Sequence, residues 1–202
     1  MELTCQIMTN PNKINVVEYS EEWPFIFEEL ETVYKEFLGD LIIDIQHIGS
    51  TAVPGLAAKP TIDIDLVIEN MEILNSVIIK LEKLGYEYQG DLGIKDREAF
   101  RRTSDRTPLD GSGRIWYKHH LYCCSKNSIS LKNHLQFRDF LCKNPEKVKK
   151  YGDLKKSLVL QHPFDINLYT ELKTPFITEI LKETGFDSAD LGDITAQNKS
   201  DI

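Results

Sequence analysis

The hydrophobic positions of this chain follow two periods, one typical of strands and one typical of helices. In the first 127 residues, five short runs rich in Ile, Val and aromatic residues predict strands, at residues 41–48, 61–68, 86–89, 99–103 and 115–124. Apolar residues spaced three and four positions apart predict two helices among them, one between Ser20 and Gly39 and one over 71–84. A glycine ends each of these helices, at Gly39 and Gly85.

After residue 127 every apolar repeat has helical spacing, which predicts three packed helices. We therefore predict an α+β fold, with a mixed β-sheet flanked by helices over 13–127 and a C-terminal three-helix segment over 128–183. Together these parts form one domain, 13–183, as the length of 202 residues also favours. The polar ends, 1–12 and 187–202, are expected to be flexible tails.

Composition narrows the classes of function. The chain carries 24 Lys and Arg against 32 Asp and Glu, a net charge of −8, which argues against general nucleic-acid or membrane-surface binding. No apolar run is long enough to cross a bilayer, so we expect no membrane insertion. The first residues do not resemble a secretory signal, and the four cysteines contain no CxxC pair, so we expect a reducing, cytoplasmic location.

The strongest chemical signal is a pair of aspartates inside an apolar strand. Side chains two positions apart lie on the same face of a strand, so Asp63 and Asp65 point the same way between Ile62, Ile64 and Leu66. Two neighbouring carboxylates in apolar surroundings repel each other unless a cation lies between them. Mg²⁺ or Mn²⁺ held by both aspartates is the functional interpretation. The alternative is a strand whose polar face is simply solvated.

A second signal is the turn Gly49-Ser50-Thr51, which follows the first predicted strand. A glycine that lets the backbone approach, together with adjacent N–H groups and two hydroxyls, makes a cradle for phosphate. Residues 95–126 contain eight basic and four acidic residues, a net charge of +4. The basic residues include Arg97 and Arg101. Guanidinium groups beside a metal-binding strand suit a polyphosphate, although a solvated hairpin explains the same charges.

The run from His119 to Cys124 suggests zinc at first sight. Strand alternation divides it, because His120, Tyr122 and Cys124 face one way while His119 and Cys123 face the other. We therefore set aside a structural zinc site and a catalytic cysteine–histidine pair. A polar role for His120 near the aspartates is the better hypothesis.

Taken together, these motifs resemble those of the GrpB family, a member of the nucleotidyltransferase-like superfamily. The resemblance extends from about residue 16 to residue 181. Its motifs are residues 47–65, 90–94, 97–101 and 119–121, His134 with residues 137–141, and the later Tyr169, Thr170 and Lys173.

What the resemblance implies is a triphosphate held by a Gly-Ser turn and Mg²⁺ or Mn²⁺ held by an Asp-x-Asp pair. Carried to this sequence, Gly49, Ser50 and Thr51 form the phosphate turn, while Asp63 and Asp65 are the metal ligands and the catalytic carboxylates. The basic residues Lys59, Arg97 and Arg101 would neutralise phosphate charge.

The superfamily usually adds a third carboxylate from a later strand, but here that strand reads Lys118-His119-His120-Leu121-Tyr122. His120 would then take the place of the third ligand, or the site would hold a single ion. Tyr122 also stands where the family commonly has histidine.

Two functions follow as hypotheses. The first is a magnesium-dependent nucleotidyltransferase that moves a nucleotidyl group from a nucleoside triphosphate to an unidentified acceptor and releases pyrophosphate. The second is a non-catalytic nucleotide- or phosphoester-binding module with the same cleft, which the missing third acid favours. A redox or metal sensor built on Cys123 and Cys124 is the weakest alternative.

Overall fold

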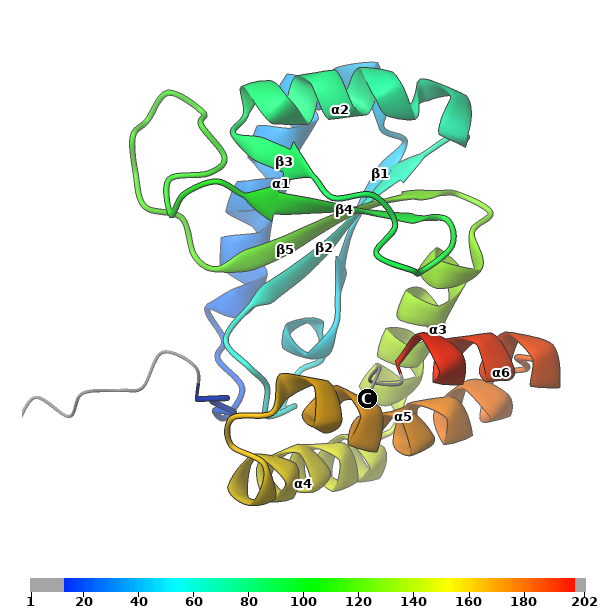
Figure 1. Ribbon diagram of the computed structural model, residues 1–202. Helices are drawn as coiled ribbons and strands as arrows, with labels where there is room; N and C mark the ends of the chain where they lie inside the picture. Colours follow the sequence, from blue (N-terminus) through cyan, green and yellow to red (C-terminus); the bar gives the residue numbers. More distant parts are fainter. Residues whose placement is uncertain (1–12, 199–202) are drawn as a thin grey trace, which may run out of the picture.

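The structure is a computed structural model that describes residues 13–198, and its centre is one five-stranded sheet (Figure 1). The strands are β1 (Asp44–Ile48), β2 (Ile62–Ile68), β3 (Tyr86–Tyr88), β4 (Arg97–Arg102) and β5 (His119–Ser125). They lie in the order β1-β2-β5-β4-β3, with β2 and β5 parallel and the other neighbours antiparallel. All five predicted strands are present, several of them shorter than predicted.

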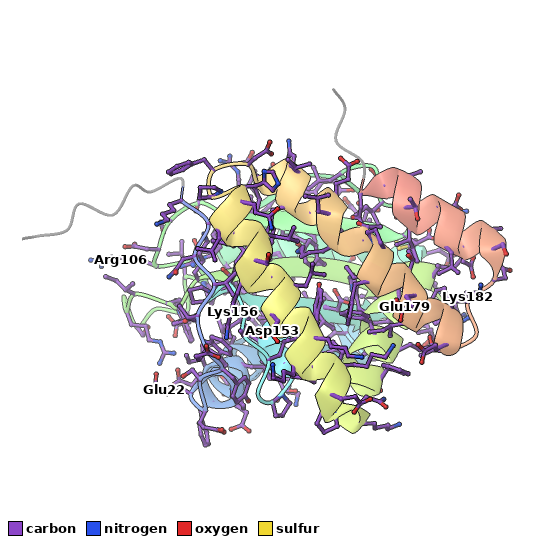
Figure 2. The ribbon with its side chains drawn as sticks, turned by 90° about the horizontal axis from the view of Figure 1, so that it is seen from below. Glu22, Arg106, Asp153, Lys156, Glu179 and Lys182 are labelled. Carbon is purple, nitrogen blue, oxygen red and sulfur yellow. The ribbon has the colours of Figure 1, made fainter. Side chains whose placement is uncertain are left out.

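Helices cover the sheet on both sides. The first two helices are α1 (Trp23–Leu38) and α2 (Leu74–Lys83), and the last four are α3 (Ile129–Lys143), α4 (Pro145–Gln161), α5 (Ile166–Glu183) and α6 (Ser188–Gln197). Three short 3₁₀ turns complete the described elements, at Gly39–Leu41, Ser50–Ala52 and Met71–Ile73. Seen from below, α4, α5 and α6 lie side by side under the sheet (Figure 2). The predicted α+β fold with a mixed sheet and a helical C-terminal segment is confirmed.

The main core lies between the sheet and the pair α1 and α2. Leu30 and Tyr34 of α1 pack against Ile62 and Ile64 of β2 and Leu121 of β5, and all five side chains are fully buried. Each large apolar side chain buried in this way contributes roughly 1.5–3 kcal/mol relative to exposure to water. This face of the sheet is the better sealed of the two.

The expectation of a flexible segment from residue 187 is wrong for α6. Asp187 caps this helix, because its side chain accepts hydrogen bonds from the backbone N–H groups of Ala189 and Asp190, each at 2.9 Å. Ile194 is buried and packs against Leu181 and Phe186. The segment is mostly polar, so no sequence pattern indicated that Ile194 would be buried against Leu181 of α5 and Phe186 of the turn after it. Residues 1–12 and 199–202, the other predicted tail positions, lie outside the described residues.

None of the helices in residues 13–198 combines the length and the hydropathy that crossing a membrane requires.

Candidate functional site

The aspartate pair lies near the start of the central parallel strands. Asp63 and Asp65 are opposite His120 and Tyr122 in the β2–β5 register, so these four side chains belong to one face of the sheet. The side chain of Asp63 is 28% exposed, whereas that of Asp65 is fully buried. One carboxylate therefore faces a cavity, and the other lies sealed beside it.

A histidine contacts each aspartate. Nδ1 of His120 lies 2.8 Å from Oδ1 of Asp63, and Nδ1 of His134, from α3, lies 2.7 Å from Oδ2 of Asp65. A carboxylate can only accept, so both ring nitrogens donate. The second oxygen of Asp65, Oδ1, is buried and has no hydrogen-bond partner within residues 13–198. A buried oxygen in this condition is costly and calls for a partner.

The turn after β1 touches Asp63 through a glycine. Gly49 has φ 70° and ψ −166°, a backbone region that glycine alone adopts readily. A Cβ atom at this position would lie 2.3 Å from Oδ2 of Asp63. The missing side chain is what allows the Gly49–Ser50 backbone to lie directly against the carboxylate.

The hydroxyl of Thr51 does not reach this cavity. The residue is fully buried, and its Oγ1 donates to the carbonyl oxygen of Thr61 at 3.2 Å and lies 3.0 Å from Nε2 of His47. Burial lowers the pKa of His47 to about 4, so the ring is neutral near pH 7. The contacts of Thr51 with His47 and Thr61 thus hold the turn in place on its buried side. The prediction that the Thr51 hydroxyl contributes to the phosphate cradle does not fit this geometry.

The C-terminal helices bring two lysines to the turn. Nζ of Lys155, on α4, lies 2.9 Å from Oγ of Ser50, and Lys155 is only 1% exposed. Lys173, on α5, lines the cavity next to Ser50 and Asp63. Burial lowers the pKa of Lys173 to about 8, with repulsion from Lys59 as a further cause. Burial also lowers the pKa of Lys155 well below its ordinary value.

Lys59, in the loop before β2, belongs to the same group of charges. Burial lowers the pKa of Lys59, and the nearby carboxylate of Asp63 opposes that shift. The same carboxylate opposes the shifts of Lys155 and Lys173. Asp63 is therefore the common counter-charge of three lysines from three parts of the chain.

Of these residues, Gly49, Ser50, Asp63, His134 and Lys173 line a cavity of about 240 Å³ between the sheet and the C-terminal helices. Arg97, from β4, lines it with its guanidinium 4.4 Å from the centre of the Tyr122 ring. Nε of Arg97 is buried and, within residues 13–198, has no hydrogen-bond partner. Three predicted phosphate contacts, Gly49, Ser50 and Arg97, thus line the same cavity as Asp63.

Arg101 lies elsewhere. Its side chain is 63% exposed and forms an ion pair with Glu87. It lines a second, open hollow of about 510 Å³ together with Lys118 and His120. The predicted site residues therefore divide between two hollows, and the hydrogen-bonded pair Asp63–His120 joins them, because each hollow is lined by one member of the pair.

The neighbouring His119 and the paired cysteines belong to the core. Nε2 of His119 lies 2.5 Å from the Tyr86 hydroxyl, and burial lowers the pKa of His119 to about 3. Cys123 and Cys124 are buried, and burial raises the pKa of both thiols, that of Cys123 to about 12. Such thiols are inert at neutral pH, which argues against a redox sensor. Residues 13–198 contain no cluster of three or more His, Cys, Asp or Glu side chains that could hold a metal ion.

Sequence reasoning assigned no role in the site to Lys155, Lys173 or His134. One signal was available for Lys155, because it follows Tyr151 by four positions and precedes Leu158 by three, on the buried side of α4. A lysine among apolar helix positions indicates a charge that needs a buried partner. The same signal was available for the other two, because Lys173 follows Tyr169 by four positions and precedes Phe176 by three, and His134 follows Leu131 by three and precedes Leu141 by seven.

The fold and the site together describe an α+β protein with an acidic pair beside a cavity that Lys173 and Arg97 line. The sequence pattern of the family described as "GrpB protein" matches residues 13–183, and the chain belongs to this family. The predicted membership is thereby confirmed.

Individual relatives agree with this assignment. The "Glutamate-rich protein GrpB" of Alkalihalophilus pseudofirmus is 32% identical over 177 residues, covering 86% of this chain and 97% of that protein. The "UPF0157 protein YqkA" of Bacillus subtilis is 33% identical over 165 residues, covering 82% of this chain but 45% of the relative, so this chain spans less than half of its length.

A solved structure is similar as well. The crystal structure of the conserved protein GrpB from Enterococcus faecalis matches with a TM-score of 0.71 and 35% identity, covering 88% of this chain and 98% of that one.

Proposed function

We propose that this protein is a nucleotidyltransferase that transfers a nucleotidyl group from a nucleoside triphosphate to an acceptor hydroxyl and releases pyrophosphate. The observation that carries the proposal is the group of cations around the Gly49–Ser50 turn and Asp63, of which Lys155 is buried and Lys59, Lys173 and Arg97 are half-buried. The membership of the superfamily with this chemistry is part of the proposal, and it rests on the Gly-Ser turn and the Asp-x-Asp pair.

The charges in and around the cavity favour a polyanion. Lys59, Lys155, Lys173 and Arg97 supply four cations, while Asp63 and Asp65 supply two carboxylates, each of which also accepts a hydrogen bond from histidine. A buried ammonium group without a full counter-charge costs several kcal/mol. The oxygens of a triphosphate bound beside Ser50 would give these cations hydrogen bonds and counter-charge. Binding would therefore stabilise the folded protein.

The aspartates fit a hard divalent cation. Oδ1 of Asp65 is a buried carboxylate oxygen without a partner in residues 13–198, and Mg²⁺ is commonly held by one or two carboxylates together with water and substrate phosphates. Asp63 and Asp65 would hold the ion. When bound, it would supply electrostatic stabilisation of the charge that develops on the α-phosphate.

His120 would accept the proton of the acceptor hydroxyl. Asp63 fixes the ring through Nδ1, so Nε2 is the nitrogen that remains for the hollow lined by Lys118 and Arg101. The acceptor oxygen would form a bond to the α-phosphorus as the bond from that phosphorus to the bridging oxygen of the β-phosphate breaks. The bonding electrons leave with pyrophosphate, and the hydroxyl proton moves to Nε2 of His120.

A pyrophosphate-release assay tests this function. Purified protein is incubated with each of the four ribonucleoside triphosphates, a panel of hydroxyl acceptors, and Mg²⁺ or Mn²⁺. We expect release that Asp63→Asn lowers by about a hundredfold or more, since one electrostatic contact to a transition state is commonly worth that much. The matched control is Asp153→Asn, an exposed aspartate on α4 that pairs with Lys149 (Figure 2). Absence of any release that depends on Asp63 would rule the transferase out.

A second candidate is a binding module that holds a nucleotide without turnover. It is favoured by one observation: among the described residues that line the cavity, Asp63 is the single carboxylate. A nucleotide at 100 times its Kd would then stabilise the fold by about 2.7 kcal/mol while no pyrophosphate appears. Thermal unfolding with and without each nucleotide, run beside the release assay, separates the two candidates.

A further inference from the structure

We propose that the outer half of the cavity is a nucleobase subsite and that α6 forms one of its walls. This inference rests on the proposed function and adds which part of the substrate the chain reads. The cavity of about 240 Å³ continues into a smaller hollow of about 110 Å³. The two share the lining residues Ile94, Ser130, Asn133, Ile194 and Gln197. They therefore form one groove that runs from Ser50 and Asp63 to α6.

The chemistry of the groove changes along its length. Its inner end holds Lys173 and Arg97 beside the Gly49–Ser50 turn. Farther out the walls are aliphatic, with Ile94 from the loop before β4, Ile177 from α5 and Ile194 from α6. The outer hollow carries more negative than positive charge, because Asp96, Asp190 and Asp193 line it together with Lys95.

Two amide side chains stand between the aliphatic walls. Asn133 of α3 and Gln197 of α6 line both hollows, and neither side chain has a hydrogen-bond partner in the described part of the chain. A carboxamide presents a donor and an acceptor side by side. Unpaired amides next to branched aliphatic surface suit a flat ring whose faces are apolar and whose edge carries donors and acceptors.

A nucleobase fits this description better than the other groups a phosphoester could carry. Asn and Gln form paired hydrogen bonds to base edges, while Ile94 and Ile194 would pack on the ring faces. A purely aliphatic chain would leave the amides of Asn133 and Gln197 unpaired. A further phosphate would lie against isoleucines and face the acids of the outer hollow, which repel it.

Helix α6, which forms this wall of the groove, lies outside the part of the chain that the family pattern matches. The family pattern ends at residue 183, whereas α6 comprises Ser188–Gln197. Figure 1 shows α6 beside α3 and α5, and Ile194 is anchored on Leu181 and Phe186. Base preference would therefore depend on residues outside the matched family region, and proteins that share residues 13–183 could differ in it.

Equilibrium binding of the full-length protein tests the inference. The probes are ATP, GTP, CTP and UTP, with inorganic triphosphate as the probe that lacks base and sugar, all in the presence of Mg²⁺. We expect at least one nucleotide to bind ten times more tightly than inorganic triphosphate. Gln197→Ala and Asn133→Ala, tested singly, should reduce that ratio about fivefold and leave the Kd of inorganic triphosphate unchanged.

The matched control is Gln161→Ala, an exposed glutamine at the end of α4, which should leave every Kd unchanged. Equal affinities for all nucleotides and inorganic triphosphate would overturn the base subsite while the phosphate site stands. Unchanged nucleotide preference in both Gln197→Ala and Asn133→Ala would overturn it as well. If neither nucleotides nor inorganic triphosphate bind, the proposed function fails, and this inference fails with it.

Discussion

Histidine is buried on one face of the sheet and partly exposed to solvent on the other. His119 and His120 are neighbours on β5, yet His119 is 3% exposed and contacts the hydroxyls of Tyr86 and Tyr34, whereas the His120 side chain is 45% exposed and contacts Asp63. The first face is filled by apolar and aromatic side chains from α1 and α2. The second leaves a cavity lined by charges. Burial, rather than residue type, decides which histidine is structural and which is free for chemistry.

The covering helices explain this difference. The buried positions of α1 are Trp23, Leu30, Tyr34 and Leu38, which form one apolar stripe against the sheet. The buried side of α4 includes Lys155, and α3 directs His134 at Asp65. The helices on one face thus pack directly on the sheet through apolar side chains. On the other face, the C-terminal helices meet the sheet through polar side chains, which leave a cavity between them. Four predictions test this contrast.

The largest effect of a single substitution on the open face is expected where the turn touches the carboxylate. Gly49→Ala should destabilise the protein by about 3 kcal/mol, because the residue occupies a region restricted to glycine and its Cβ would meet Asp63. Gly55→Ala is the control, since Gly55 also has a positive φ, 77°, but nothing within 4 Å of a built Cβ. Its loss should be about 1–2 kcal/mol. Urea unfolding of both variants checks the difference, and equal losses would show that the contact with Asp63 is unimportant.

The sealed face should make the protein sensitive to acid. Burial holds the pKa of His119 at about 3 and that of His47 at about 4, against an ordinary value of 6.5. The unfolded chain therefore takes up these protons first, so stability is fully present above pH 6.5 and falls as the pH drops toward 4. Each group contributes a slope of about 1.4 kcal/mol per pH unit.

His47→Gln should remove from this slope the contribution of one titrating group, about 1.4 kcal/mol per pH unit. Unfolding free energies measured at intervals between pH 7 and pH 4 give the slopes. A wild-type stability that does not change over this range would contradict the account of the sealed face.

The third prediction is that one substitution on the open face raises the stability of the fold and weakens triphosphate binding. Lys155→Met should stabilise the fold by about 1–2 kcal/mol, because an apolar side chain replaces a desolvated ammonium group. The same change should weaken triphosphate binding, since Ser50 loses the group that contacts its Oγ. Lys156→Met is the neighbouring control, because Lys156 is 40% exposed and pairs with Glu18 (Figure 2). Thermal unfolding and triphosphate titration of both variants are the measurements, and parallel behaviour would argue against a special role for Lys155.

The smallest effect concerns pH and affinity. With a pKa of about 8, Lys173 carries its charge at neutral pH and loses it as the pH rises, so triphosphate affinity should fall about tenfold from pH 7.5 to pH 9. Lys173→Met should bind more weakly at pH 7.5 and show little further change. Lys182→Met, an exposed lysine on the same helix (Figure 2), should retain the wild-type profile. A wild-type affinity that stays constant to pH 9 would exclude Lys173 from the phosphate contacts.

Much of the fold could be predicted because it depends on local pattern. The spacing of apolar residues located the strands and the first five helices, and alternation within a strand placed Asp63 and Asp65 on one face and separated His119 from His120. The lysines of the site could not be placed in this way. Lys155 and Ser50 are 105 residues apart, so only packing brings them together.

Two further differences have physical reasons. Arg97 and Arg101 share a face of β4 by alternation, yet the register with β3 places Arg101 opposite Glu87 and away from the cavity. Helix α6 was missed because its stability depends on Ile194 meeting Leu181 and Phe186, a contact that no local pattern reveals.

The central claim is that the cavity between the sheet and the C-terminal helices binds the triphosphate of a nucleotide. A crystal structure with Mg²⁺ and a nucleoside triphosphate analogue that cannot be cleaved between the α- and β-phosphates tests it most directly. We predict phosphate oxygens on the Gly49–Ser50 turn, within hydrogen-bond distance of Lys173 and Arg97. A nucleotide bound elsewhere, or a cavity without density at saturating concentrations, would contradict the account.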